Sequence, residues 1–246
     1  IDPITAKAIK RSSFLAALVS LAIGMIGVLA AKKLDRLIAF AVIGSMGMVM
    51  VAISLFTPAA IAAALYYIIH STLAGAALFL ISDLVRTGRA NLDLTPQAPV
   101  AGAALTAGLF FTVAIAMAGL PPLSGFLGKL LILQAAFPSD LMVWIWAIVL
   151  GSSLISILGF ARAGSTLFWK SQGVTVPEDT ARPPRPAALS YVAVGGLIAL
   201  LVAHTVFAGQ VHSYTSAIAA QLFAPQDYSA IVLETPGKLS IPQEDY

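Results

Sequence analysis

The sequence contains no cysteine. That absence removes disulfide frameworks, thiolate zinc sites, iron–sulfur clusters and c-type haem attachment together. Charge is also scarce, since only 10% of the 246 residues are charged, and the 14 basic residues lie scattered between apolar runs without forming a nucleic-acid-binding stripe. What is abundant is apolar: 59% hydrophobic residues and a mean hydropathy of +0.93 exclude an ordinary soluble fold and indicate that the solvent is lipid.

Apolar windows long enough to cross a bilayer, about 20 residues each, occur six times and predict an all-α, polytopic membrane helix bundle. The expected spans are 14–31, 37–56, 59–85, a fourth within 100–137, then 141–168 and 187–208. The chain thus divides into an extramembrane start at 1–13, a transmembrane bundle at 14–208 and a tail at 209–246. The tail begins with an amphipathic stretch expected at the membrane interface and then turns polar.

The fourth apolar stretch is too long for one straight helix, because about 38 residues would reach about 57 Å. Prolines without amide donors and glycines that permit non-helical backbone interrupt its middle, so we expect a discontinuous helix broken at Pro121-Pro122. The residues of the expected break are Gly119, Pro121, Pro122, Ser124 and Gly125.

The distribution of basic residues distinguishes one broken span from a hairpin of two spans. One broken span places nine basic residues on one side and four on the other, whereas a hairpin gives seven against six. The nine are Lys32, Lys33, Arg36, Arg86, Arg89, Arg162, Lys170, Arg182 and Arg185, and the four are Lys7, Lys10, Arg11 and Lys238. The asymmetry favours one broken span. The side of the membrane with nine basic residues is then cytoplasmic, and both chain ends lie outside.

Lys129 is the charged residue that no loop accounts for, since it lies seven residues after the break and is followed by Leu-Leu-Ile-Leu. A lysine at mid-membrane costs about 2.5–3.5 kcal/mol on insertion scales. One interpretation is functional: carbonyls freed by the break, together with water, solvate an ammonium that takes up and releases a proton. The alternative is that the broken helix lifts Lys129 to an interface, where it snorkels.

His70 lies near the middle of the third span, and Tyr66, Tyr67 and Ser71 form a polar strip with it on one side of the helix. An imidazole both donates and accepts a proton near neutral pH, although a lone intramembrane histidine often only hydrogen bonds to a neighbouring helix. We expect His204 and His212, at the end of the sixth span and in the tail, to be interfacial.

Enzyme chemistry has no support in the sequence. No pair of histidines or carboxylates has metal-ligand spacing, and no nucleophile with a base, phosphate loop or dinucleotide fingerprint occurs. We therefore expect neither a metal nor a cofactor. The small residues Gly44 and Gly47 in the second span predict close helix packing.

Three blocks resemble the antiporter-like membrane subunits shared by respiratory complex I and the multisubunit Mrp cation/proton antiporters, in the same order and spacing. They are LIAF at 37–40 with SMG at 45–47, YIIHSTLAGAALFL at 67–80, and AGLPPLSGFLGK at 118–129. The second block, the end of the third, and Phe168-Trp169 look most like the D-type subunits of the Mrp (Pha or Mnh) antiporters.

The resemblance implies that the chain corresponds to the carboxyl-terminal half of such a subunit, with eight further spans upstream. It implies that His70 is a central proton relay and Lys129 the terminal titrating lysine. Ser45 joins the polar axis, because many relatives carry His or Gln there. Many relatives also carry a second His after His70 and a Lys at Gly75, so water has to fill more of the axis here.

The function that this resemblance implies is that of a membrane subunit of a Na+ or K+/H+ antiporter complex, in the bacterial inner (plasma) membrane. Its partners are the other subunits of that complex, protons and Na+ or K+. Two alternatives stay open: a proton-pumping membrane subunit of a quinone-linked NADH dehydrogenase, and a non-conducting fragment or scaffold.

Overall fold

The computed structural model describes residues 3–99, 102–174 and 185–224, and these fold as helices with no strand among them. The helices are α1 Pro3–Ala30, α2 Leu34–Ile53, α3 Pro58–Arg89, α4 Ala103–Ala118, α5 Ser124–Ala135, α6 Met142–Gly164, α7 Ala188–Val206 and α8 Ala208–Phe223. A π-helical turn (Ser165–Trp169) and a 3₁₀ turn (Lys170–Gly173) extend α6. The all-α bundle predicted from the apolar windows is confirmed.

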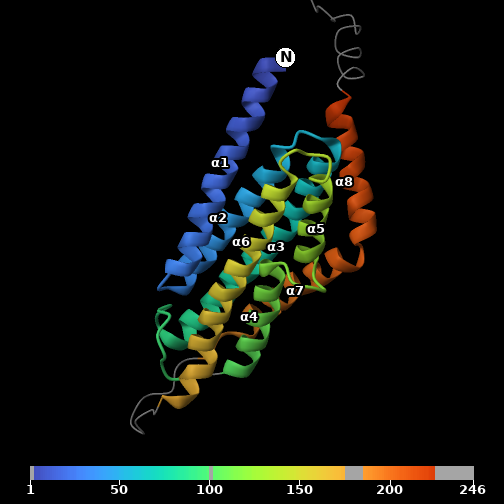
Figure 1. Cartoon of the computed structure of the whole chain (residues 1–246). Coiled ribbons are helices and arrows are strands. Elements are labelled where there is room, and N and C mark those ends of the chain that lie inside the picture. The colour runs from blue at the N-terminus through green and yellow to red at the C-terminus, as the bar shows by residue number, and fades with distance from the viewer. Residues whose placement is uncertain (1–2, 100–101, 175–184, 225–246) are drawn as a thin grey trace, which may run out of the picture.

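Among the described residues, five helices are long and apolar enough to cross a membrane, namely those beginning at Ala8, Leu34, Pro58, Met142 and Ala188. The fourth expected span consists of the two shorter apolar helices α4 and α5. In Figure 1, α5 follows α4 along the long axis of the bundle, and α6 then returns beside both. This arrangement is one broken span and not a hairpin.

The break has a defined geometry. Gly119 adopts a left-handed φ of 78°, a conformation that glycine adopts at little cost, and ends α4. The amides of Gly119 and Leu120 donate to the carbonyls of Ala116 and Ile115, which is a Schellman-type cap. Leu123 is extended, and the chain becomes helical again at Ser124.

Helix α3 is the central element, because it contacts α2, α4, α5, α7 and α8. Helices α1 and α2 pair closely on one flank of the bundle, and α7 and α8 cover another (Figure 1). The close pairing of α1 and α2 depends on glycine: a Cβ on Gly24 would collide with the backbone of Gly44, and one on Gly47 would lie 2.7 Å from the amide nitrogen of Leu21. The packing role predicted for Gly44 and Gly47 is therefore confirmed.

The ends of the chain differ in detail from the sequence expectations. Helix α1 begins at Pro3, so helical structure extends into the predicted extramembrane start. The first part of the predicted tail forms α8, which packs along α3. Its placement at the membrane interface stays a prediction, and residues 225–246 of the tail lie outside the described residues, as does 175–184 of the expected loop.

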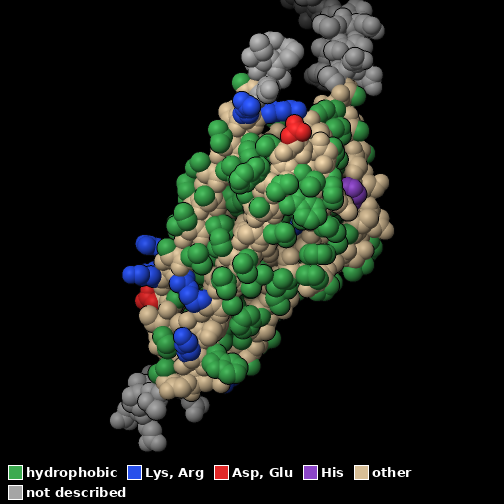
Figure 2. Space-filling view, viewed as in Figure 1, with side chains coloured by type: hydrophobic (Ala, Val, Ile, Leu, Met, Phe, Trp, Pro, Cys, Tyr) green, Lys and Arg blue, Asp and Glu red, His purple; other side chains and the backbone are tan. Residues whose placement is uncertain are grey.

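The surface agrees with a membrane environment. Figure 2 shows hydrophobic side chains over the middle of the face in view, with Lys, Arg and Asp or Glu side chains gathered toward its two ends. Large apolar side chains on α1 and α6 are more than half exposed, including Ile26 at 68% and Leu154 at 57%. Such exposure suits contact with lipid tails.

Candidate functional site

Lys129 lies inside the bundle, with only 6% of its surface exposed. Its Nζ donates to the carbonyl oxygen of Ala118, at 2.7 Å, and to the hydroxyl of Ser153 on α6, at 2.8 Å. Ala118 is the last residue of α4, and a carbonyl at a helix end has no intrahelical partner. The break therefore supplies an acceptor to the buried amine, and the structure does not place Lys129 at an interface.

Gly119 leaves room for this lysine. A Cβ at Gly119 would lie 2.6 Å from Cδ of Lys129 and 2.9 Å from its Nζ. The same glycine thus ends α4 in a left-handed conformation and lets the Lys129 side chain pass against the backbone. Any other residue at this position would hold the left-handed conformation only at a cost in free energy and would crowd the Lys129 side chain.

His70 contacts the other side of the break. The residue is fully buried on α3, and its Nδ1 forms a 2.9 Å hydrogen bond with the hydroxyl of Ser124, the first residue of α5. Its Nε2 is buried without a hydrogen-bond partner. A Cβ at Gly125 would lie 2.6 Å from that Nε2 and would also strike the carbonyl oxygen of Ala116, so Gly125 allows the imidazole to approach the backbone.

The polar axis predicted from the sequence is partly assembled. The hydroxyls of Ser45 on α2 and Ser71 on α3 hydrogen bond to each other, and the Tyr67 ring lies 5.7 Å from the His70 ring. Pro121 and Pro122 stand in the non-helical segment between α4 and α5.

A small cavity connects several of these groups. Its polar lining comes from Lys129, Ser45, Tyr67, Ser152 and Ser156, with apolar side chains closing the rest. The space open to the centre of a water-sized sphere is about 10 Å³, close to what one water molecule needs. The cavity is therefore at the lower limit of what holds one water molecule, and both Lys129 and Ser45 line it.

Tyr66 turns away from this cavity toward α7. Its ring stacks on that of His204, with centroids 4.3 Å apart. The Tyr66 hydroxyl donates to the carbonyl of His204, and Nε2 of His204 lies 3.3 Å from the carbonyl of Tyr66. Only 6% of the surface of His204 is exposed, so this residue is enclosed by protein, and its depth in the membrane stays a prediction. Packing of α7 against α3 buries it.

Sequence reasoning also missed the serines of α6 that face Lys129. Ser152 and Ser156 are buried and Ser153 donates and accepts beside the amine. Their spacing of three and four residues is helical, and it was visible as the polar stripe of an otherwise apolar span. That stripe marks the inward face of α6.

No carboxylate neutralises Lys129 within 3–99, 102–174 and 185–224. The ion pairs found there join Lys33 to Asp93 and Arg86 to Asp83, near the helix ends that lie on the predicted cytoplasmic side. The same ranges hold no cluster of three or more His, Asp or Glu residues able to bind a metal ion. The acceptors around the buried amine are accordingly neutral oxygens.

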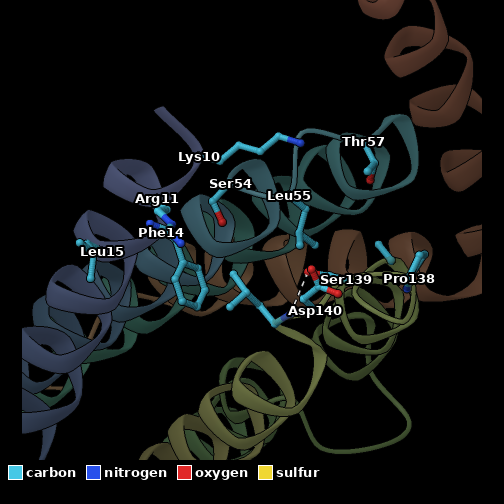
Figure 3. Close-up of a pocket in the computed structure, with 12 residues that line it drawn as sticks. Lys10, Arg11, Phe14, Leu15, Ser54, Leu55, Thr57, Pro138, Ser139 and Asp140 are labelled. Atoms are coloured by element: carbon cyan, nitrogen blue, oxygen red, sulfur yellow. Dashed lines mark hydrogen bonds between the residues drawn. The ribbon is translucent and has the colours of Figure 1, made fainter. Parts of the chain in front are cut away.

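A hollow of about 720 Å³ opens at the end of the bundle where α5 meets α6. Figure 3 shows Lys10 and Arg11 from α1 on one side of it, and Ser139 and Asp140 from the α5–α6 turn on the other. Its lining reaches Ala135, which is six residues, about 9 Å, beyond Lys129 along α5. A buried apolar cluster that includes Leu21, Met48, Ile132, Leu133 and Ile145 belongs to this same half of the bundle, and Ile132 and Leu133 stand between Lys129 and Ala135 along α5.

Comparison with known proteins gives a consistent result. Residues 2–156 match the family described as NADH:quinone oxidoreductase/Mrp antiporter, TM. The chain is 29% identical to the D-type subunit of a probable K(+)/H(+) antiporter of Rhizobium meliloti, over 89% of this chain and 45% of that protein. It is 30% identical to the D-type subunit of the Na(+)/H(+) antiporter of Bacillus subtilis, over 86% of this chain and 42% of that protein.

Solved structures share the fold. A chain of the Mrp complex from Dietzia superposes with a TM-score of 0.79 at 21% identity, covering 91% of this chain and 49% of that one. A chain of respiratory complex I from Thermus thermophilus gives a TM-score of 0.72 at 24% identity, with coverages of 87% and 45%. The chain thus spans less than half the length of these relatives. Because the family match covers residues 2–156, more than half of the sequence, this chain belongs to the NADH:quinone oxidoreductase/Mrp antiporter transmembrane family.

Proposed function

We propose that this chain is part of a membrane subunit of a Na+ or K+/H+ antiporter complex, and that Lys129 carries the proton. The observation that supports this most is the pair of neutral acceptors around the buried amine, Ala118 O and Ser153 Oγ. An ammonium has three donors, and a neutral amine keeps two of them and gains a lone pair. Two acceptors therefore satisfy either form, while the third position is left for water in the adjoining cavity.

His70 is proposed as the relay member next to Lys129. A serine hydroxyl donates or accepts, so the bond between Ser124 and Nδ1 of His70 suits either tautomer of the ring. Nε2, buried without a partner, is then the atom at which a proton or a water arrives. Because Ser124 begins α5 and Lys129 reaches the end of α4, movement of the two half-helices would change both contacts together.

Cation movement is coupled to Lys129 by charge exclusion in this proposal. Two unit charges 4 Å apart repel by about 4 kcal/mol at an effective dielectric constant of 20. A Na+ or K+ ion close to the site would thus favour the neutral amine, and the ammonium would exclude the ion. The relatives named as K+/H+ and Na+/H+ antiporter subunits support both cations equally.

The experiment is cation-driven proton movement in inverted membrane vesicles that contain the intact complex. Lys129→Ala is expected to abolish antiport, and His70→Ala to lower it by about 10²-fold, the low end of the range for a positioned proton-transfer group. Lys170→Ala is the matched control, since that lysine is exposed in the 3₁₀ turn that follows α6. If Lys129→Ala assembles normally and retains full antiport, Lys129 is not the proton carrier. If His70→Ala retains full antiport, His70 has only a packing role.

A second candidate is a proton-pumping membrane subunit of a quinone-linked NADH dehydrogenase. It is supported by the fold shared with complex I and by 27% identity to an N-type subunit of the NADH-quinone oxidoreductase of Thioalkalivibrio sulfidiphilus, over 76% of this chain. Co-purification of the intact complex separates the two functions. Flavin-containing and iron–sulfur subunits in the complex would favour the dehydrogenase, whereas their absence favours the antiporter. If the intact assembly moves no protons by either route, the chain is a scaffold.

The proposed location is the bacterial inner membrane, with both chain ends outside. The orientation follows from the basic residues on the predicted cytoplasmic side and is testable because the sequence has no cysteine of its own. Thr95→Cys, in the α3–α4 loop, should react with an impermeant thiol reagent only from the cytoplasmic side. Ser139→Cys, in the α5–α6 turn, should react only from outside. The opposite labelling pattern overturns the orientation.

A further inference from the structure

A groove on the outer face of the α1–α2 pair has no part in the proton site. Its volume is about 540 Å³, within the range of small-molecule sites. Apolar side chains line its length, and two cations stand at the end where α1 turns into α2. The lining residues are Ile23, Ile26, Gly27, Ala30, Ala31, Lys32, Arg36 and Phe40.

The apolar part of the groove lies on the exposed side of the bundle. Ile23 is 51% exposed and Ile26 68% exposed. Gly27 forms part of the floor, since a Cβ there would collide with the ring of Phe40 and push it outward. The groove is therefore open along α1 on the exposed side of the described helices.

The two basic side chains at the end of the groove, Lys32 and Arg36, are exposed, and unlike Lys33 they form no ion pair with a described residue. Lys33, in the same turn, lies 3.9 Å from Asp93, whereas Lys32 and Arg36 make no ion pair with any carboxylate of the described residues. The nearest carboxylate in sequence, Asp35, accepts from the backbone amide of Arg36. Lys32 and Arg36 thus line the end of the groove without an ion-pair partner among the described residues, while Asp35 keeps its negative charge in the same turn.

A second hollow of about 280 Å³ adjoins this mouth and shares Ala31 and Lys32 with the groove. It adds Arg162 from α6 and Thr95 from the α3–α4 loop. Arg162 donates to the carbonyls of Val28 and Ala31, and so stabilises the end of α1 and brings a third positive charge near the mouth. Figure 2 shows basic side chains gathered over the region where α1 turns into α2.

We propose that this groove binds an anionic phospholipid. The phosphate lies between Lys32 and Arg36, and an acyl chain follows Ile23, Ile26 and Phe40 along α1. Arginine and lysine at the membrane surface attract anionic headgroups, and the planar guanidinium forms paired hydrogen bonds to phosphate. A soluble anion would bind the two basic side chains but would leave the apolar part of the groove empty. A zwitterionic lipid would fill the apolar part of the groove but would bring no net negative charge to the two basic side chains.

The test measures lipid bound to the intact membrane protein by native mass spectrometry, with phosphatidylglycerol and phosphatidylcholine as the probes. The wild-type protein is expected to bind phosphatidylglycerol more tightly. Lys32→Gln and Arg36→Gln are each expected to weaken that binding about fivefold, since each basic residue at the surface contributes about that factor. Binding of phosphatidylcholine is expected to change little in either variant.

Two further variants keep the outcome interpretable. Lys33→Gln removes the same charge from the same turn but not from the groove, so it is expected to leave binding nearly unchanged. Ala30→Trp fills the groove without changing charge and is expected to reduce binding of both lipids. Equal weakening by Lys33→Gln and Lys32→Gln indicates a diffuse surface charge and overturns the site. Equal binding of the two lipids, or undiminished binding in Ala30→Trp, also overturns it.

Discussion

Gly119→Ala tests the geometry of the break between α4 and α5, because it adds a single Cβ next to the Lys129 side chain. Gly119 has a φ of 78°, where a residue with a Cβ loses roughly 1–2 kcal/mol. The added Cβ would lie 2.6 Å from Cδ of Lys129 and 2.9 Å from its Nζ. Those atoms are the far end of a flexible side chain, so Lys129 can yield while the backbone stays in place. We therefore expect the variant to fold but to displace the amine from Ala118 or Ser153.

The expected magnitude follows from those contacts. A hydrogen bond made by a charged group contributes about 1.5–3 kcal/mol. Loss of one of the two, added to the backbone cost, lowers the free energy of unfolding by about 2.5–5 kcal/mol. If the same contact is needed to position Lys129 during transport, a loss of 1.4 kcal/mol or more slows antiport at least about tenfold.

The assays are thermal unfolding of the purified protein and cation-driven proton movement in vesicles. Gly108→Ala is the matched control, because it lies on the same helix and no atom stands within 4 Å of its added Cβ. Alanine is the better helix former there, so stability should be unchanged or higher by up to about 1 kcal/mol. Wild-type stability and wild-type antiport in Gly119→Ala would refute the proposed contact between the break and Lys129.

Two other substitutions test the packing around the site. Ser124→Ala removes the hydrogen-bond partner of Nδ1 of His70 and should lower the free energy of unfolding by about 1–3 kcal/mol. Chemical or thermal unfolding measures this change. An unchanged free energy of unfolding means that water replaces the hydroxyl. Gly24→Ala puts a Cβ onto the backbone of Gly44 and should cost about 1–3 kcal/mol, whereas Gly195→Ala in α7 meets no atom within 4 Å and should cost nothing. Equal stability of the two glycine variants contradicts the close α1–α2 contact.

Much of the fold follows from the sequence because the membrane restricts the choices. Backbone groups in lipid must be satisfied within helices, so each apolar window of sufficient length predicts a helix. The interruption at Pro121-Pro122 was equally readable, since it combines missing donors with glycine on both sides. The choice of one broken span over a hairpin came from the distribution of basic residues, and the structure confirms it.

The partners of each site residue were not predictable in the same way. A membrane helix is apolar on its lipid face as well as on its packed face, so hydrophobic periodicity does not mark the interior. Helix α7 illustrates this: Leu201 is buried and Leu200 is 53% exposed, with nothing in the residue types to separate them. The burial of His204 against Tyr66 was not predicted for that reason. Polar residues are more informative, and the serines of α6 would have indicated the side facing Lys129.

The most direct test of the central claim is the protonation state of Lys129 in the intact complex. Nitrogen NMR of labelled lysine distinguishes ammonium from amine, and the signal of Lys129 is identified by its loss in Lys129→Ala. The account predicts one lysine signal that converts between the two forms within the pH range in which the complex exchanges cations for protons. A Lys129 signal that stays ammonium across that whole range contradicts it.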